Sequence, residues 1–107
     1  AVLVALADTI RANLRRSDSA FRFGGEEFVV LLPETGIDQA QRVAERIRGR
    51  FAEFDHAPEP GIAIRSTVSI GVVGYRADES GSDCIRRADQ AMYAAKQKGK
   101  NCVVVAP

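Results

Sequence analysis

Apolar residues at the start of the chain recur at intervals of three and four positions. They are Val2, Leu3, Leu6, Ile10 and Leu14, and charged residues fill many of the positions between them. This spacing places the apolar side chains on one face of a helix. The pattern therefore predicts an amphipathic helix over residues 2–16.

A β-hairpin is predicted next. Residues 21–23 and 28–32 are rich in aromatic and β-branched side chains, and the segment between them begins with two glycines. Short β-rich runs on either side of a glycine turn are typical of a hairpin. Pro33 ends the second strand, because proline has no N–H to donate to a continuing ladder.

The middle of the chain predicts a second helix and a strand. Helical spacing begins at Asp38, and its apolar stripe ends near Phe54. Residues 56–61 contain two prolines and end in glycine, which is typical of a turn. Residues 64–73 then alternate apolar and polar positions well enough to predict a strand.

The last part of the chain predicts a third helix and a short strand. Ser80 or Ser82 can cap the helix, because a serine hydroxyl accepts a hydrogen bond from a backbone N–H of the first turn. Gly99 suits the C-terminal end of the helix, and the three valines at 103–105 predict a strand. The apolar stripe of this helix consists of Ile85, Ala88, Ala91, Met92 and Ala95.

The predicted order of elements, α-β-β-α-β-α-β, indicates one α+β domain, an α/β sandwich. It is similar to a ferredoxin-like arrangement without its first strand. Loss of that strand would leave backbone N–H and C=O groups unpaired at a gap in the sheet. We therefore expect that the chain was cut from a longer protein, or that a second copy shields the gap.

Composition and charge exclude several classes of protein. The chain has 107 residues, of which 46% are hydrophobic and 27% charged, as in a small soluble domain. Its formal charge of +1 does not favour non-specific binding to nucleic acid or membranes, and its apolar start is too short for a membrane span. Phosphate binding would therefore need a local cluster of charge.

The cysteines and the histidine indicate no metal site. Cys84, Cys102 and His56 are too few for the usual four-ligand zinc site. We interpret the cysteines as packing residues of a reduced protein and His56 as a surface residue. The side chains predicted to lie in the core include Phe21, Phe23, Phe28 and Met92.

The hairpin turn carries the most distinctive chemistry. Gly24 and Gly25 allow a ligand to approach the backbone, and Glu26 and Glu27 concentrate negative charge beside them. Mg²⁺ takes carboxylate oxygens and shares its other positions with substrate phosphates, which predicts a metal and nucleotide site. The alternative is an ordinary turn with two solvated glutamates.

These residues resemble the signature of the GGDEF family, the diguanylate cyclase domains of bacteria. Residues 24–28 read GGEEF, a form of the motif for which the family is named, and they lie on a predicted hairpin as the family motif does. Further segments similar to the family are RRSD at 15–18, AERIR at 44–48, TVSIG at 67–71, ADQAMYAAK at 88–96 and GKN at 99–101. Several ordered matches are far more specific than the five-residue motif alone.

The resemblance implies a fold, a reaction and partners. The fold is a nucleotidyl-cyclase palm with an antiparallel hairpin. Two GGDEF domains meet as a homodimer, the 3′-hydroxyl of each GTP attacks the α-phosphate of the other, and cyclic di-GMP and pyrophosphate form. The implied cofactor is Mg²⁺ (or Mn²⁺), and the implied location is the cytoplasm, without contact of this domain to nucleic acid or membrane.

The resemblance also assigns roles to the hairpin residues. Glu26 would bind the metal and act as the base for the 3′-hydroxyl, and Glu27 would support the metal site. Gly24 and Gly25 would admit the nucleotide. In-line phosphoryl transfer needs charge neutralisation and alignment, which a carboxylate-bound metal provides.

Two lysines and an RxxD motif complete the implied sites. Lys96 and Lys100 would bind GTP phosphates from one helix face if the helix persists, and Lys100 stands where many members have arginine. Their alternative role is to complement the helix dipole.

Arg15 and Asp18, joined by Arg46, resemble the family's inhibitory site for cyclic di-GMP. The alternative is that they belong to a solvated run of charges.

The family's domain begins earlier, with a strand that carries another metal-binding aspartate and a guanine-recognition segment. Neither is present in 1–107, which covers about three-fifths of the domain on the α/β layout. We expect the intact parent to synthesise cyclic di-GMP and the fragment alone to be inactive. The alternatives are a catalytically inactive cyclic di-GMP sensor and a purely structural dimerising domain.

Overall fold

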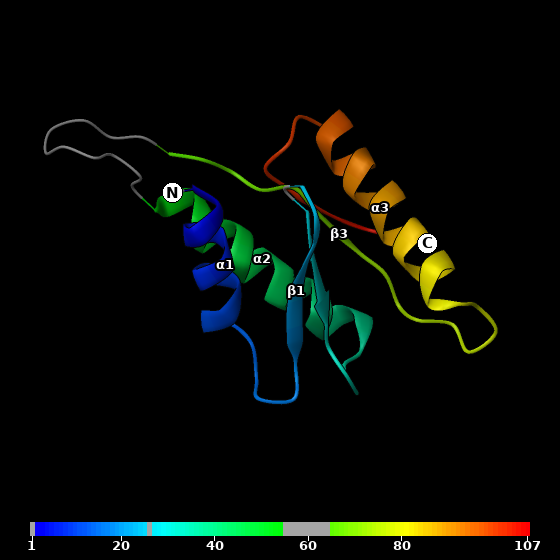
Figure 1. The fold of residues 1–107 in the computed structure, drawn as a ribbon. Helices are drawn as coiled ribbons and strands as arrows, with labels where there is room; N and C mark the ends of the chain where they lie inside the picture. Colours follow the sequence, from blue (N-terminus) through cyan, green and yellow to red (C-terminus); the bar gives the residue numbers. More distant parts are fainter. Residues whose placement is uncertain (1, 26, 55–64) are drawn as a thin grey trace, which may run out of the picture.

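A computed structural model describes residues 2–25, 27–54 and 65–107 of the chain. The elements are α1 (Val2–Ala12), β1 (Ser19–Gly24), β2 (Glu27–Leu31), α2 (Ile37–Glu53), β3 (Ile70–Val72), α3 (Gly81–Gln97) and β4 (Val103–Val105), as Figure 1 shows. This order of helices and strands confirms the one predicted from the sequence. Glu26 and the predicted turn at 56–61 lie outside the described residues.

The first helix is shorter than predicted, because its backbone changes partners after Ala12. The N–H groups of Asn13 and Leu14 still bond to carbonyls three residues earlier, at 3.0 and 3.2 Å. The N–H of Arg15 instead donates to the Asp18 carboxylate at 2.7 Å. A short acidic side chain that binds a nearby backbone N–H competes with helix continuation, so the prediction of a helix to residue 16 was wrong.

The hairpin is confirmed, with a tight turn. β1 and β2 are antiparallel, from Ser19 opposite Leu31 to Gly24 opposite Glu27, with a register shift between Arg22 and Gly24. Gly24 and Gly25 have φ angles of +134° and +51°. These angles lie in the region that glycine adopts without a steric penalty, and so the two glycines permit the turn.

The predicted strand at 64–73 is mostly not a strand. In the described part of this segment, only Ile70–Val72 forms a ladder, parallel to β4, with Ile70 opposite Val103. The ladder can be no longer than its partner, and β4 has only three residues. Residue 64 lies outside the described residues.

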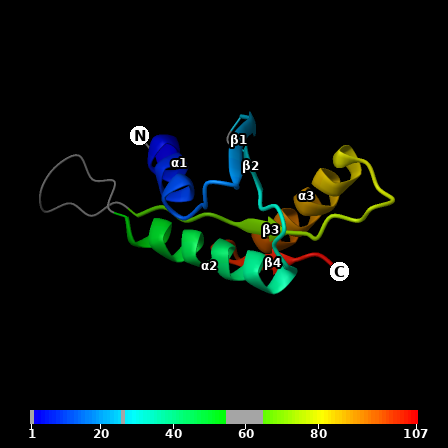
Figure 2. The same cartoon turned by 90° about the horizontal axis from the view of Figure 1, so that it is seen from below.

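The described strands form two separate sheets of two strands each, β1 with β2 and β3 with β4. Figure 2 shows the hairpin standing apart from β3, while α2 and α3 both pack against β3 and β4. This separation agrees with the expected gap in the sheet.

The third helix begins and ends where its capping residues predict. Ser80 is the N-cap, and its side chain accepts a hydrogen bond from the N–H of Asp83 at 3.1 Å, which decides between the two candidate serines. At the other end the N–H of Lys98 donates to Ala94 O at 3.0 Å, and Gly99 follows with φ +115°. A residue with positive φ after the last turn is a common helix end.

The hydrophobic core lies between α1 and α2. Its buried cluster consists of Leu6, Ile10, Val43, Ile47 and Phe51, and Phe28 packs against it. The prediction that Phe21 and Phe23 belong to the core was wrong, because they are 43% and 51% exposed. They lie on β1, whose six residues are all exposed.

Candidate functional site

The hairpin turn presents an open, glycine-lined surface. A Cβ added at Gly24 or Gly25 would meet nothing within 4 Å, so space remains for a ligand close to the backbone. The Arg22 guanidinium donates from Nε to the carbonyl of Gly25 at 2.7 Å and braces the turn. Glu27 is exposed at the start of β2. Glu26, the predicted base, lies outside the described residues.

A cavity of about 430 Å³ lies between the hairpin and α3. Its lining consists of Phe23, Glu27, Ser82, Ile85, Arg86 and Asp89. Glu27 therefore shares a concave surface with a second carboxylate, Asp89, and with the Arg86 guanidinium, which also pairs with Asp83 at 3.1 Å. Sequence reasoning missed the α3 members of this lining, although Asp89 lies in the segment 88–96 that resembles the family.

The described residues do not by themselves supply a complete metal site. Among residues 2–25, 27–54 and 65–107, no group of three or more His, Cys, Asp or Glu side chains could hold a metal ion. Glu27 has the hard oxygen donors that Mg²⁺ prefers. A metal bound by Glu27 would therefore need further ligands from outside the described residues.

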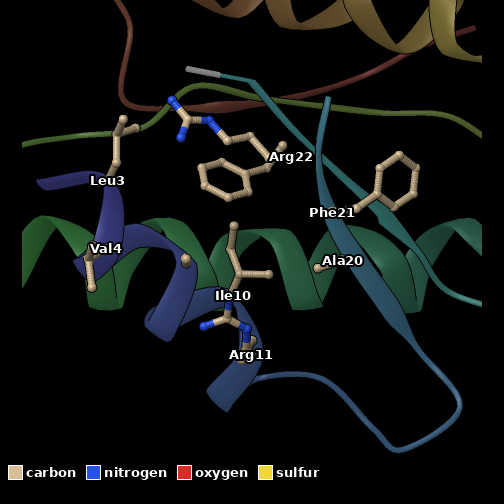
Figure 3. A pocket seen from close by; sticks show the side chains of 9 residues that line it. Leu3, Val4, Ile10, Arg11, Ala20, Phe21 and Arg22 are labelled. Carbon is tan, nitrogen blue, oxygen red and sulfur yellow. The ribbon is translucent and has the colours of Figure 1, made fainter. Parts of the chain in front are cut away.

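A second pocket, of about 250 Å³, lies between α1 and β1 (Figure 3). Its lining is largely apolar and includes Leu3, Ile10 and Ala20. Arg22 and Phe21, successive residues of β1, also line the pocket, and their side chains leave the strand in different directions. This pocket adjoins the hydrophobic core and contains no carboxylate.

The two lysines implied in phosphate binding do not share a helix. Lys96 lies in the last turn of α3, the helix ends at Gln97, and Lys100 has φ +65°. The condition for one shared helix face is therefore not met, because the positive φ of Gly99 turns the chain away from the helix axis. Both lysines are exposed, and neither ammonium group has a partner among the described residues, which leaves them able to bind phosphate.

A hydrogen bond connects the loop that carries Lys100 to α2. Asn101, with φ +50°, accepts a hydrogen bond from Nη1 of Arg48 at 2.8 Å. The same guanidinium contacts Glu45 at 3.2 Å. Left-handed conformations of non-glycine residues persist only where surrounding contacts hold them. Arg48 is such a contact, and sequence spacing alone could not show it.

Arg15 and Asp18, the two ends of the RxxD motif, bind each other directly. Arg15 binds the carboxylate through Nη2 at 3.2 Å and through its backbone N–H at 2.7 Å. The same Nη2 donates to Thr35 Oγ1 at 2.6 Å and Pro33 O at 3.1 Å. Hydrogen bonding from the Arg15 guanidinium lowers the pKa of Asp18, against an opposing effect of burial. Asp18 therefore stays ionised and holds Arg15 in place.

Arg46 bonds to Asn13, a residue that sequence reasoning missed. Its Nε donates to Oδ1 of Asn13 at 2.9 Å, and no hydrogen bond or ion pair joins it to Arg15 or Asp18 in the described structure. Asn13 is buried, with 8% of its surface exposed. The available signal was its position, three residues after Ile10 on the apolar stripe of the first helix.

A further ion pair, also missed, fixes the loop before α3. Glu79 accepts from Arg87 Nε and from the backbone N–H of Arg76, each at 3.0 Å, and Arg87 also donates to Gly74 O at 2.6 Å. These hydrogen bonds, the one from Arg87 first, lower the pKa of Glu79 to about 2. Burial raises the pKa of the nearby Cys84 thiol, so this cysteine is not an activated nucleophile.

No described helix is long and apolar enough to cross a lipid bilayer. Both cysteines are free, and the Cys102 thiol donates a hydrogen bond to Ala95 O at 3.4 Å.

Comparison with known proteins identifies the family. The family model described as "Diguanylate cyclase, GGDEF domain" matches residues 1–102. The chain therefore belongs to the GGDEF domain family, as the signature at 24–28 predicted.

Two curated relatives are themselves named diguanylate cyclases. Diguanylate cyclase DgcM of Escherichia coli is 45% identical over 105 residues, which are 98% of this chain and 25% of DgcM. Diguanylate cyclase DgcP of Pseudomonas aeruginosa is 40% identical over 107 residues, 98% of this chain and 16% of DgcP. The chain thus spans a quarter or less of these relatives.

Solved structures confirm the fold. The GGDEF domain of DgcB from Caulobacter crescentus, in complex with c-di-GMP, superposes with a TM-score of 0.90 at 29% identity, over 97% of this chain and 62% of that chain. Diguanylate cyclase SiaD of Pseudomonas aeruginosa, in complex with its activator SiaC, also has a TM-score of 0.90, at 37% identity, over 98% of this chain and 40% of that chain. The α+β palm fold predicted from the sequence is confirmed.

Proposed function

We propose that residues 1–107 are the C-terminal part of a diguanylate cyclase domain whose intact parent condenses two GTP molecules into cyclic di-GMP and releases pyrophosphate. The observation that carries the proposal is the GGEEF sequence on a hairpin whose glycines adopt positive φ and leave open space. Named cyclases among the relatives support it.

Glu26 acts as the base that accepts the proton of the attacking 3′-hydroxyl, and Glu27 lies beside it on β2. Mg²⁺ (or Mn²⁺), when bound by these carboxylates and a ligand from elsewhere, neutralises phosphate charge. Lys96 and Lys100 bind the phosphates of GTP from two separate segments, the end of α3 and the loop after it. Gly24 and Gly25 admit the nucleotide to the turn.

The reaction needs two such domains, because each contributes one GTP to a symmetric product. The partner is therefore a second GGDEF domain in a homodimer, and the domain works in the cytoplasm without binding nucleic acid or membrane. The remaining metal ligand and the guanine contacts come from outside the fragment. Residues 1–107 alone are consequently inactive.

Cyclic di-GMP inhibits the parent by binding to Arg15, Asp18 and Arg46. Arg15 is exposed and held by the buried Asp18 carboxylate, so its guanidinium is positioned before any ligand arrives. An arginine in a fixed orientation can bind a phosphodiester through two parallel hydrogen bonds. The complex of DgcB with c-di-GMP supports binding of this product by a GGDEF domain.

Chromatography of GTP reactions tests the synthetic function. The full-length parent should form cyclic di-GMP with Mg²⁺, its Glu26→Gln variant should lose at least about a hundredfold in rate, and 1–107 should form none. A conservative exchange removes the base and keeps the side-chain volume. Product formation at an undiminished rate by Glu26→Gln would refute the assigned role.

A second function, sensing of cyclic di-GMP without synthesis, is favoured by one observation. The Arg15 and Asp18 unit is ordered entirely by residues within the chain, including Thr35 and Pro33. A parent that binds cyclic di-GMP and forms none from GTP would replace the cyclase assignment with this one. A parent that does neither would leave the purely structural role.

A further inference from the structure

Two arginine side chains of α2 converge on one acceptor at the end of α1. Arg46 donates from Nε to Asn13 Oδ1 at 2.9 Å, and Arg50 donates from Nη1 to the same oxygen at 2.7 Å. Because both nitrogens bond to one atom, they lie within about 6 Å of each other. We call Asn13, Arg46 and Arg50 the Asn13 cluster.

The acceptor is held in a defined orientation. Asn13 donates from Nδ2 to Thr9 O at 2.7 Å, which turns its Oδ1 toward α2. It is the one buried polar residue in the described parts of the chain. A buried amide satisfied on both sides fixes the groups bonded to it, so the two guanidinium groups are positioned by the protein.

The charges of the Asn13 cluster are not balanced. Neither Arg46 nor Arg50 forms an ion pair within the described residues, since Asp18 pairs with Arg15 and Glu45 pairs with Arg48. Two guanidinium groups around one neutral oxygen repel each other, and a bound anion would relieve that repulsion.

Unused donors face the solvent. Arg46 and Arg50 are both exposed. Nη1 of Arg46 and both Nε and Nη2 of Arg50 have no acceptor among the described residues. Guanidinium groups in this state bind the paired oxygens of a phosphate or phosphodiester in a fork geometry.

We propose that Arg50 is a further ligand-binding residue of the cyclic di-GMP site and that Asn13 is the positioning residue that holds Arg50 beside Arg46. The proposal rests on the product-binding role given above to Arg15, Asp18 and Arg46. Asn13 precedes Arg15 by two residues, so their Cα atoms are at most about 7 Å apart. A ligand with two phosphodiesters can therefore contact both Arg15 and the Asn13 cluster.

A purely structural role for the same contacts makes a different prediction. Nη2 of Arg46 also approaches Asn13 O at 3.5 Å, and cations at a helix C-terminus stabilise the helix. On that reading, loss of Arg50 would change stability and leave the affinity for cyclic di-GMP unchanged in the folded variant.

Titration calorimetry with cyclic di-GMP on the natural full-length polypeptide separates the two readings. Arg50→Gln should weaken binding on the order of tenfold, the effect of losing one charge-assisted contact. The matched control is Arg42→Gln, which removes the same charge two turns earlier on α2, where the guanidinium bonds, within the described part of the chain, only to Gln39, at 3.0 and 3.3 Å. The control should change affinity less than about twofold, because the charge is exposed and screened.

Asn13→Ala tests the positioning role. The variant removes the acceptor that Arg46 and Arg50 share and leaves both positive charges in place. Affinity for the anionic ligand should fall on the order of tenfold, while the salt dependence of binding is kept, because no charge has changed. Unchanged affinity in the folded variant would show that Asn13 only supports the helix.

The outcomes distinguish the inference from the function on which it rests. If Arg15→Ala abolishes binding and Arg50→Gln matches Arg42→Gln, the inference is overturned and the inhibitory site stands. If the wild type does not bind cyclic di-GMP, both are overturned. Circular dichroism checks that each variant is folded, and Arg50→Lys, which keeps the charge but loses the fork, replaces Arg50→Gln if that variant unfolds.

Discussion

Gly71 is the position where one added methyl group should damage the fold most clearly. It lies in β3, opposite Val104, with α3 packed against it. A Cβ at this position would overlap the carbonyl oxygen of Ala88 and the backbone nitrogen of Met92, and would lie 3.0 Å from the carbonyl carbon of Ala91. A side chain could rotate away, whereas a helix backbone has to move as a unit.

The expected cost of Gly71→Ala follows from those contacts. Overpacking typically costs about 1–3 kcal/mol. The two overlapping atoms and the third close one all belong to the backbone of one helix, so we expect a loss of at least about 3 kcal/mol, at the top of that range. This is a large part of the stability of a domain of this size, about 5–15 kcal/mol. The corresponding fall in Tm is more than about 10 °C.

Urea unfolding followed by circular dichroism measures the effect. The matched control is Gly49→Ala, which lies inside α2, where an added Cβ meets nothing within 4 Å. Alanine in an open helix position should raise the free energy of unfolding by about 0.5–1 kcal/mol. If Gly71→Ala unfolds within about 0.5 kcal/mol of the wild type, β3 and α3 do not pack as described.

Three further predictions concern the helix ends and charged residues. The pKa of Glu79 is lowered from 4.5 to about 2, so its contribution to the free energy of unfolding is present above about pH 4.5 and lost as the pH falls toward 2. Glu79→Gln should therefore make the free energy of unfolding depend less on pH in this window. The same pH dependence in both proteins would contradict this. Ser80→Ala should lower the free energy of unfolding in urea by about 1 kcal/mol, because the N-cap hydrogen bond is lost. Ser82→Ala, the control, should change it little. Equal effects of the two variants would show that Ser80 is not the N-cap. In the full-length parent, Lys96→Ala should raise the KM for GTP about tenfold, because a phosphate contact is lost. Lys98→Ala, the control, should leave the KM for GTP unchanged. Equal KM values for the two variants would argue against phosphate binding by Lys96.

The sequence predicted the hairpin and the third helix well because local chemistry determines both. Gly24 and Gly25 permit backbone angles that other residues avoid, and a turn forms wherever β-rich runs flank them. Ser80 and Gly99 act on groups within a few residues of themselves. These are the interactions that a reader of the sequence can see.

The predictions failed where a side chain competes for a backbone group and where burial needs a covering element. Asp18 takes the N–H of Arg15 and helps to end the first helix before residue 16. Phe21 and Phe23 are aromatic, but their burial depends on whether another element covers β1. Apolar character makes burial favourable, and it cannot supply the partner.

The candidate sites divide in the same way. Sequence alone indicated the family, from ordered matches along the chain, and the GGEEF turn and the RxxD motif, whose residues are adjacent or three apart. Only the tertiary structure brought Asn13 to Arg46 and Arg50, and Arg48 to Asn101, across 33, 37 and 53 residues. Such contacts arise from how α1, α2 and the loop after α3 pack, and packing is a property of the whole chain that no local spacing contains.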